Sequence, residues 1–214
     1  FLRKTMPPDL FRKSLFLLNP GKEFKLNTSI LKAFGYERVF SVTEPAQFSI
    51  KGGIIDIFVP GDDNPVRIET FDNKIESIRR FDPGTQRSIE RLDSFEFVPG
   101  AEALTLEEHL KLAMDRVSYA EKQMGAKATF KLDDSCNLDT ISGMFYKSQS
   151  ILADYLPKET AFIFIEPDKA VDEFSRLERE VLEMLEEKPV EKFLYKRFAG
   201  LTPEYFFKLH DYTI

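Results

Sequence analysis

Side chains suited to recognition occupy every second position of one short run, PVRIETF. Successive side chains of a β-strand point to opposite faces, so Arg67, Glu69 and Phe71 are predicted to share one face, opposite the apolar side. A neighbouring predicted strand, Phe48 to Lys51, likewise places Lys51 away from its apolar side. Arginine and aromatic side chains on a sheet surface are typical of the hot spots of protein–protein interfaces. This face therefore predicts a protein-binding site.

Phe71 has two interpretations. In the first, the ring stays on the charged face of the strand and contacts a partner. In the second, the turn Asp72-Asn73 distorts the end of the strand, and the ring folds back into the core. The alternation of residue types alone leaves both alternatives open.

Residues that carry catalysis, or that bind metals and phosphates, form no recognisable motif. A nucleotide-hydrolysing domain needs a glycine-rich phosphate loop that ends in Lys-Ser or Lys-Thr, and neither Gly21-Lys22 nor Gly125-Ala126-Lys127 has that spacing. The two histidines, His109 and His210, are far apart in the sequence, and Cys136 has no histidine near it. We therefore predict no catalytic, cofactor-binding or metal-binding residue in this segment.

Composition and length restrict the class of protein. A chain of 214 residues is long enough for one large domain or two small ones, and 43% hydrophobic residues can form a core. The net charge of −6 argues against a basic nucleic-acid binder, although a local basic patch remains open. One cysteine excludes a disulfide framework, and no apolar run approaches the ~18 residues of a membrane span. We expect a cytoplasmic protein and, because the chain begins with Phe1, a piece of a longer polypeptide.

The elements that position this face are predicted to form an α+β unit. Residues 1–13 are predicted to be an extended connector, Ser14–Leu18 a strand, and Thr28–Phe34 a helix capped by Asn27 and ended by Gly35. Further strands are predicted at Glu37–Thr43, Phe48–Lys51, Gly53–Val59, Val66–Phe71 and Lys74–Phe81. Short turns between strands predict an antiparallel sheet with the helix packed against it. The glycine pair Gly52-Gly53 indicates a bulge or a close backbone approach.

Beyond residue 100 the hydrophobic period changes from two to 3.6. A capping box of Thr105 and Glu108 predicts a helix, whose buried stripe is Leu106, Leu110, Ala113, Met114 and Val117. The later elements are predicted as a helical stretch Ile141–Leu156, a buried strand Phe162–Ile165, a helix Asp168–Glu187, a strand Phe193–Arg197 and a helix from Thr202 or Pro203. This order predicts part of an α/β layer, with a sheet that is incomplete on its own.

Several runs together resemble a known family. FSIKGGIIDIF, PVRIE and residues 71–88 closely resemble the UvrB-homology region of the bacterial transcription-repair coupling factors, known as Mfd. UvrB, the damage verifier of nucleotide excision repair, has a similar pattern, but Thr85–Ser88 and the run GGII look more like the coupling factors. The similarity continues through Cys136–Gly143, Leu152–Pro157 and Phe162–Glu166.

The resemblance implies a domain order and a partner. Residues 21–98 would be an α+β UvrA-binding domain, residues 1–20 a connector or the end of a first RecA-like part, and residues 99–214 the second part of a degenerate RecA-like α/β domain. By family analogy the UvrA-binding residues are Lys51, Arg67 and Phe71. Most relatives carry arginine at the first of these positions, so Lys51 is a departure that keeps the charge but loses the bidentate fork. The implied function is to recruit UvrA to lesions at stalled RNA polymerase.

The resemblance also implies that this segment is not catalytic. The run Glu166-Pro167-Asp168 lacks the adjacent Asp-Glu pair that serves ATP hydrolysis in UvrB, so no cofactor is expected here. ATP, duplex DNA and RNA polymerase would be bound by other domains of a parent DNA translocase, and a C-terminal domain would mask the UvrA-binding surface. The alternative is a fragment of UvrB itself, a DNA-engaging helicase subunit. The missing phosphate loop, the absence of a β-hairpin insertion for gripping DNA, and the acidic charge argue against it.

Overall fold

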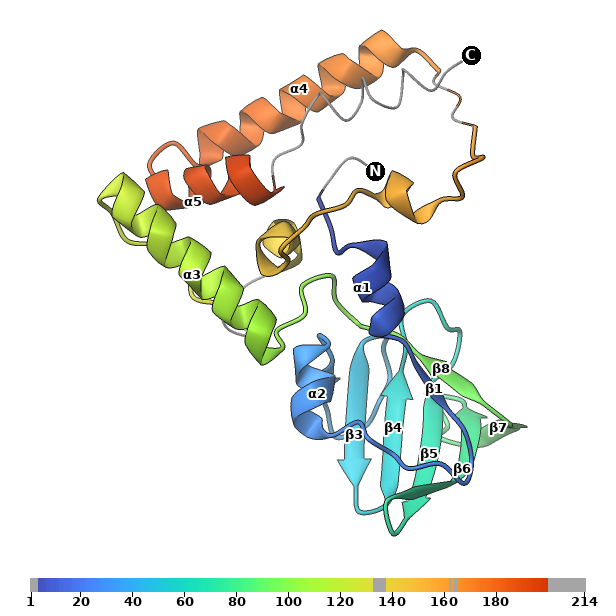
Figure 1. The fold of residues 1–214 in the computed structure, drawn as a ribbon. Helices are drawn as coiled ribbons and strands as arrows, with labels where there is room; N and C mark the ends of the chain where they lie inside the picture. The colour runs from blue at the N-terminus through green and yellow to red at the C-terminus, as the bar shows by residue number, and fades with distance from the viewer. Residues whose placement is uncertain (1–3, 133–137, 162, 164, 200–214) are drawn as a thin grey trace. The chain divides into compact units, whose positions relative to one another are not determined.

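The computed structural model of the chain describes residues 4–132, 138–161, 163 and 165–199 (Figure 1). The chain forms two compact units, which we call the sheet unit, Leu10–Leu106, and the helical unit, Phe1–Asp9 with Glu107–Ile214. The assignment of these units to the domains expected from the resemblance stays a prediction.

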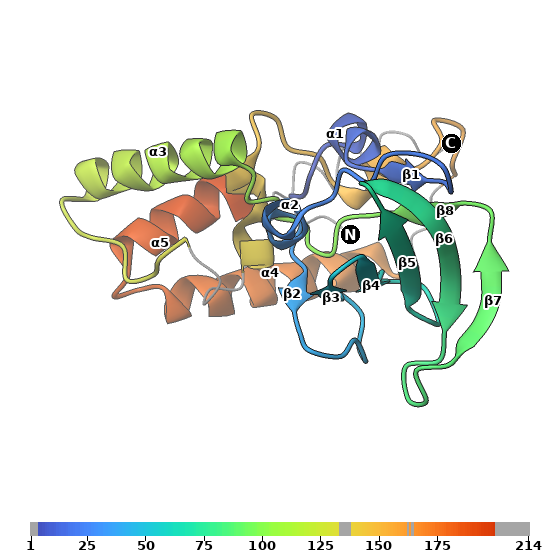
Figure 2. The same ribbon diagram turned by 90° about the horizontal axis from the view of Figure 1, so that it is seen from below.

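The sheet unit is built on a six-stranded sheet in the order β2-β3-β4-β5-β6-β7 (Figures 1 and 2). Its strands are β2 (Glu37–Arg38), β3 (Gln47–Lys51), β4 (Ile54–Phe58), β5 (Val66–Phe71), β6 (Lys74–Phe81) and β7 (Ser88–Leu92). Neighbours from β3 to β7 pair antiparallel, as short turns predict, whereas β2 pairs parallel to β3. The prediction of a wholly antiparallel sheet is therefore wrong at this edge.

The predicted strand Glu37–Thr43 is also too long, because the structure has only Glu37–Arg38 in the sheet. Beyond Arg38 the chain leaves the sheet and crosses back to the start of β3. Val42 then enters a buried cluster with Phe58 and Phe81. The sequence pattern predicted that Val42 belongs to a strand, but in the structure it lies outside the sheet strand and its side chain is buried in this cluster.

A second, two-stranded sheet pairs β1 (Phe16–Leu18) antiparallel with β8 (Phe95–Phe97). Two short helices accompany it, α1 (Pro8–Lys13) and α2 (Thr28–Ala33). The extended connector predicted for residues 1–13 is thus wrong over Pro8–Lys13. A proline suits the first turn of a helix, and Asp9 near the start with Lys13 at the end complements the helix dipole.

Most of the core of the sheet unit lies on one face of the large sheet, and a smaller buried cluster of Val42, Phe58 and Phe81 lies on the other face. The fully buried side chains of the larger part include Phe48, Ile57, Val66, Ile68 and Ile78. An aromatic cluster joins β1, α2 and β8 through Phe16, Phe34, Tyr36 and Phe97. Helix α2 lies at the β2–β3 edge of the sheet in both views (Figures 1 and 2).

The ends of α2 follow the sequence prediction. The side chain of Asn27 accepts a hydrogen bond from the Ile30 backbone N–H at 2.9 Å. Gly35 has φ +85°, and a Cβ there would lie 2.2 Å from the Cβ of Ala101, so only glycine fits.

The helical unit contains α3 (Glu107–Met124), α4 (Pro167–Met184) and α5 (Pro189–Leu194). Its described residues also form two 3₁₀ segments, Leu138–Phe145 and Leu152–Tyr155, and a π-helical turn, Tyr195–Ala199. The continuous helical stretch predicted at Ile141–Leu156 is therefore two short pieces. Among the described residues no helix is long and apolar enough to cross a membrane.

The predicted α/β layer is not confirmed. The part of this unit that the structure describes contains no β-strand. Phe193–Arg197, predicted as a strand, is helical because Pro189 starts α5. Ile163 and Ile165 lie outside any strand and are 88% and 84% exposed, so the predicted buried strand is wrong at these two residues.

Several other predictions for the helical unit concern residues that the structure does not describe, and one concerns the buried face of α3. Phe162, Phe164, Cys136 and the helix expected from Thr202 or Pro203 lie outside the described residues. On α3, His109, Ala113 and Ala120 are buried, whereas Met114 is exposed. The predicted stripe is therefore right at Ala113, half-buried at Leu106, Leu110 and Val117, and wrong at Met114.

Candidate protein-interaction site

Strand pairing gathers the predicted site residues on one face. Lys51 of β3 lies opposite Ile54 of β4, which in turn lies opposite Glu69 of β5. Two residues back along β5, Arg67 lies opposite Asp56. These rows alternate with the buried rows of the core, so they form the other face of the sheet, which we call the outer face. The prediction that β5 presents Arg67, Glu69 and Phe71 together is confirmed.

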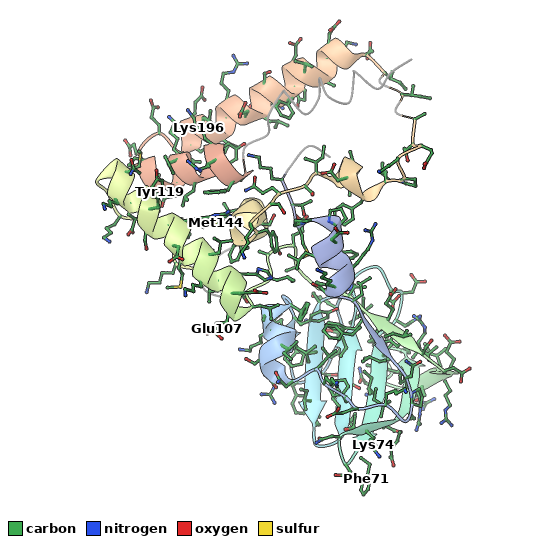
Figure 3. All side chains as sticks on the ribbon, viewed as in Figure 1. Phe71, Lys74, Glu107, Tyr119, Met144 and Lys196 are labelled. Atoms are coloured by element: carbon green, nitrogen blue, oxygen red, sulfur yellow. The ribbon has the colours of Figure 1, made fainter. Side chains whose placement is uncertain are left out.

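Phe71 ends β5 on the outer face and is 73% exposed. The next two residues, Asp72 and Asn73, have φ values of 48° and 58° and make the tight turn into β6. Figure 3 shows the ring of Phe71 pointing away from the sheet at the tip of this hairpin. The structure therefore excludes the alternative in which the ring folds into the core.

A second hairpin ends beside the first. Gly52 and Gly53 connect β3 to β4, and the Thr70 N–H donates to the Gly53 carbonyl at 2.7 Å. A Cβ on Gly53 would lie 2.4 Å from the Thr70 carbonyl oxygen, which no larger residue tolerates. The close backbone approach predicted from the glycine pair is confirmed. We call this end of the outer face, with Lys51, Ile54 and Phe71, the hairpin end.

Lys51 lies against an aromatic ring that the sequence did not single out. Its Nζ is 3.7 Å from the centroid of the Phe40 ring, and Phe40 is 84% exposed. Ile54, directly opposite Lys51, is also exposed. Phe40 was missed because it falls within the predicted strand Glu37–Thr43, where alternation alone does not show which side faces solvent.

Arg67 is less available than the sequence predicts. Its Nε and Nη2 donate to the two carboxylate oxygens of Asp56 at 2.7 and 2.8 Å, and Nη2 also donates to Gln86 Oε1 at 3.2 Å. The guanidinium lies 4.5 Å from the centroid of the Phe81 ring. The hydrogen bond with Asp56 raises the pKa of Arg67 above its ordinary value. Asp56, an acid within the apolar run IIDIF, was the sequence signal for this pair.

The second arginine of this region is also paired. Glu69 accepts from Arg79 Nη2 at 2.6 Å and from Ser77 Oγ at 2.5 Å. No carboxylate lies within 4.0 Å of the Lys51 ammonium in the part of the chain that the structure describes. The hairpin end therefore combines an unpaired lysine with exposed apolar side chains, beside two arginines that are already neutralised.

This arrangement suits recognition of a partner protein. Among the described residues no group of three or more His, Cys, Asp or Glu side chains could hold a metal ion. Exposed aromatic rings next to a cation, such as Phe40 beside Lys51, are features of protein-binding hot spots.

Comparisons with known proteins agree with this interpretation. Residues 17–102 match the family described as the UvrB interaction domain. The chain is 31% identical over 209 residues to a transcription-repair-coupling factor of Bacillus subtilis, covering 86% of this chain and 18% of the relative. Relatives of the same name in Haemophilus influenzae and Staphylococcus aureus are 27% and 28% identical, cover 80% and 82% of the chain, and have 16% of their own length matched. The chain thus spans less than a fifth of each of these relatives, and the resemblance predicted from the sequence is confirmed.

Proposed function

The chain is a relative of the transcription-repair-coupling factors and contains a UvrB interaction domain, and from this premise we propose that it is a UvrA-binding module. In this proposal it imitates UvrB and recruits UvrA to DNA lesions at stalled RNA polymerase. The contact surface is the outer face of the sheet, with Lys51, Arg67 and Phe71 as binding residues.

The exposed ring of Phe71 is the observation that carries the proposal. A phenyl side chain that is 73% exposed at the end of a strand is buried only to a small extent in the folded chain. Covering it with a partner removes apolar area from water, and the paired hairpins hold the ring in position beforehand. Preorganised aromatic anchors of this kind contribute most of the affinity in many interfaces.

Titration of purified UvrA with this chain tests the proposal. We expect binding by the wild-type chain and a loss of about tenfold or more for Phe71→Ala, the scale of a hot-spot residue. Leu17→Ala is the matched control, because Leu17 is 66% exposed but belongs to the two-stranded sheet. Equal affinities for Phe71→Ala and Leu17→Ala would contradict the assignment of this surface.

The remaining roles are part of the same proposal. The segment itself performs no catalysis, and ATP, RNA polymerase and duplex DNA are bound by other parts of a larger DNA translocase. The helical unit is proposed as the second part of a degenerate RecA-like domain, and a C-terminal domain of the parent masks the UvrA-binding surface. The shared name of the relatives favours this proposal over the alternative of a UvrB fragment.

A further inference from the structure

Phe40 is held outward by a well-anchored loop. Before it, the Val39 N–H donates to the Phe48 carbonyl at 2.9 Å, and the carbonyl of Phe40 itself accepts from Ser49 Oγ at 3.2 Å. After it, Val42 is fully buried against Phe58 and Phe81. The backbone is therefore fixed on both sides of a phenyl ring that is 84% exposed. Such a ring loses little conformational freedom when a partner covers it.

The charged groups around Phe40 determine which chemical groups of a partner can bind beside its ring. The Lys51 ammonium lies 3.7 Å from the ring centroid, which is a cation–π contact. Lys74, which lies opposite Phe71 in the β5–β6 hairpin, also has no ion pair among the described residues. Glu69, the acid opposite Ile54, is engaged by Arg79, and Asp72 lies in the turn beyond Phe71. The hairpin end, together with the adjacent Lys74, thus offers lysines without ion pairs beside apolar side chains.

From these contacts we propose that Phe40 is a further binding residue, and that Phe40 and Lys51 together receive a partner segment with a carboxylate next to an apolar side chain. The carboxylate pairs with the Lys51 ammonium, and the apolar side chain packs on Phe40 and Ile54. The surface is continuous with Phe71 through Ile54, because the two strands that carry them are neighbours. This inference rests on the proposed function, since it takes UvrA as the partner.

Four variants of the chain, titrated against UvrA, test the inference. Phe40→Ala is expected to weaken binding by about tenfold, and Phe40→Leu by less, because leucine keeps apolar area but loses the ring face. Lys51→Met is expected to weaken binding and to make the affinity less dependent on salt, since it removes the charge that pairs with the carboxylate. Leu17→Ala is the control.

The outcomes separate the two claims. Thermal unfolding should be close to wild type for Phe40→Ala, because so exposed a ring contributes little to folding. If wild type binds and Phe71→Ala binds weakly while Phe40→Ala equals Leu17→Ala, the inference is overturned and the proposed function stands. If the affinity of Lys51→Met for UvrA depends on salt as strongly as that of the wild type, the claim that a partner carboxylate pairs with Lys51 is overturned. No binding by the wild-type chain would overturn the proposed function itself.

Discussion

At the scale of single residues, the three expected binding residues are not equivalent. Phe71 is exposed and has no role in the core, whereas Arg67 is partly buried and holds Asp56 through two hydrogen bonds. Lys51 lies between these cases, exposed but in contact with Phe40. A substitution at Arg67 therefore changes the fold as well as the surface, and its effect on binding needs a structural control.

Removal of Arg67 alone should destabilise the sheet unit. Arg67→Ala leaves the Asp56 carboxylate buried without its partner, at a cost of about 2–3 kcal/mol in the free energy of unfolding, somewhat below a fully buried pair. The double variant Arg67→Ala/Asp56→Ala removes both groups and should recover most of that loss. Urea unfolding of the wild type and of both variants checks this.

The same double variant decides the role of Arg67 in binding. If the guanidinium contacts UvrA, the stable double variant still binds more weakly than wild type. Wild-type affinity in the double variant would show that Arg67 only supports the sheet. A single variant as stable as wild type would contradict the structural role of the ion pair.

At the scale of elements, α3 carries the clearest pH-sensitive contact. His109 is buried beside Tyr146, with ring centroids 5.3 Å apart, and its Nε2 has no hydrogen-bond partner among the described residues. Burial lowers the pKa of His109 below its ordinary value, against the opposing effects of Glu108 and of the hydrogen bond with the Phe145 backbone. Protonation of this side chain therefore opposes the packing of α3.

Stability is expected to fall as the pH drops below about 6.5, the ordinary pKa of histidine. In that range the unfolded chain binds a proton that the folded chain resists, so the free energy of unfolding decreases by at most about 1.4 kcal/mol per pH unit. Urea unfolding at pH 7.5 and 5.5 should show a smaller difference for His109→Phe than for the wild type. The same difference in both proteins would remove His109 as the cause.

Also at this scale, the sequence predicted the middle of the sheet well and its edges poorly. Strands β3, β4, β5 and β6 are joined by local turns, and a local pattern of turn residues and alternation is enough to find them. The pairing of β1 with β8 joins segments almost eighty residues apart, which no local pattern encodes. Phe40 was missed for a related reason, because burial of Val42 against two distant rings decides where the loop runs.

In the helical unit, by contrast, a clear local pattern predicted a strand that the structure does not contain at Ile163 and Ile165. The apolar run at residues 162–165 matches a buried strand in composition, yet Ile163 and Ile165 are exposed and unpaired with any strand. A short apolar run becomes a strand only when a neighbouring strand supplies hydrogen bonds. That information comes from distant parts of a fold, and neither run length nor residue type contains it.

At the scale of the whole molecule, the net charge of −6 favours the UvrA-binding module over the alternative of a DNA-engaging UvrB fragment. We expect no binding of duplex DNA by this chain at physiological salt, because affinity for DNA depends on a concentration of basic residues. Fluorescence anisotropy with a labelled duplex, at low and at physiological salt, checks this. Salt-dependent binding that survives to about 0.15 M would instead favour the UvrB-fragment alternative.

We propose above all that the hairpin end of the outer face binds UvrA. Hydrogen exchange of the chain with and without UvrA tests it without any substitution. We predict slower exchange of backbone amides around Phe40, Gly52–Gly53 and Thr70–Lys74 when UvrA is present, with no change in β1 and β8. Protection confined to β1, β8 or the helical unit, or no protection under conditions where the two proteins bind, would contradict the claim.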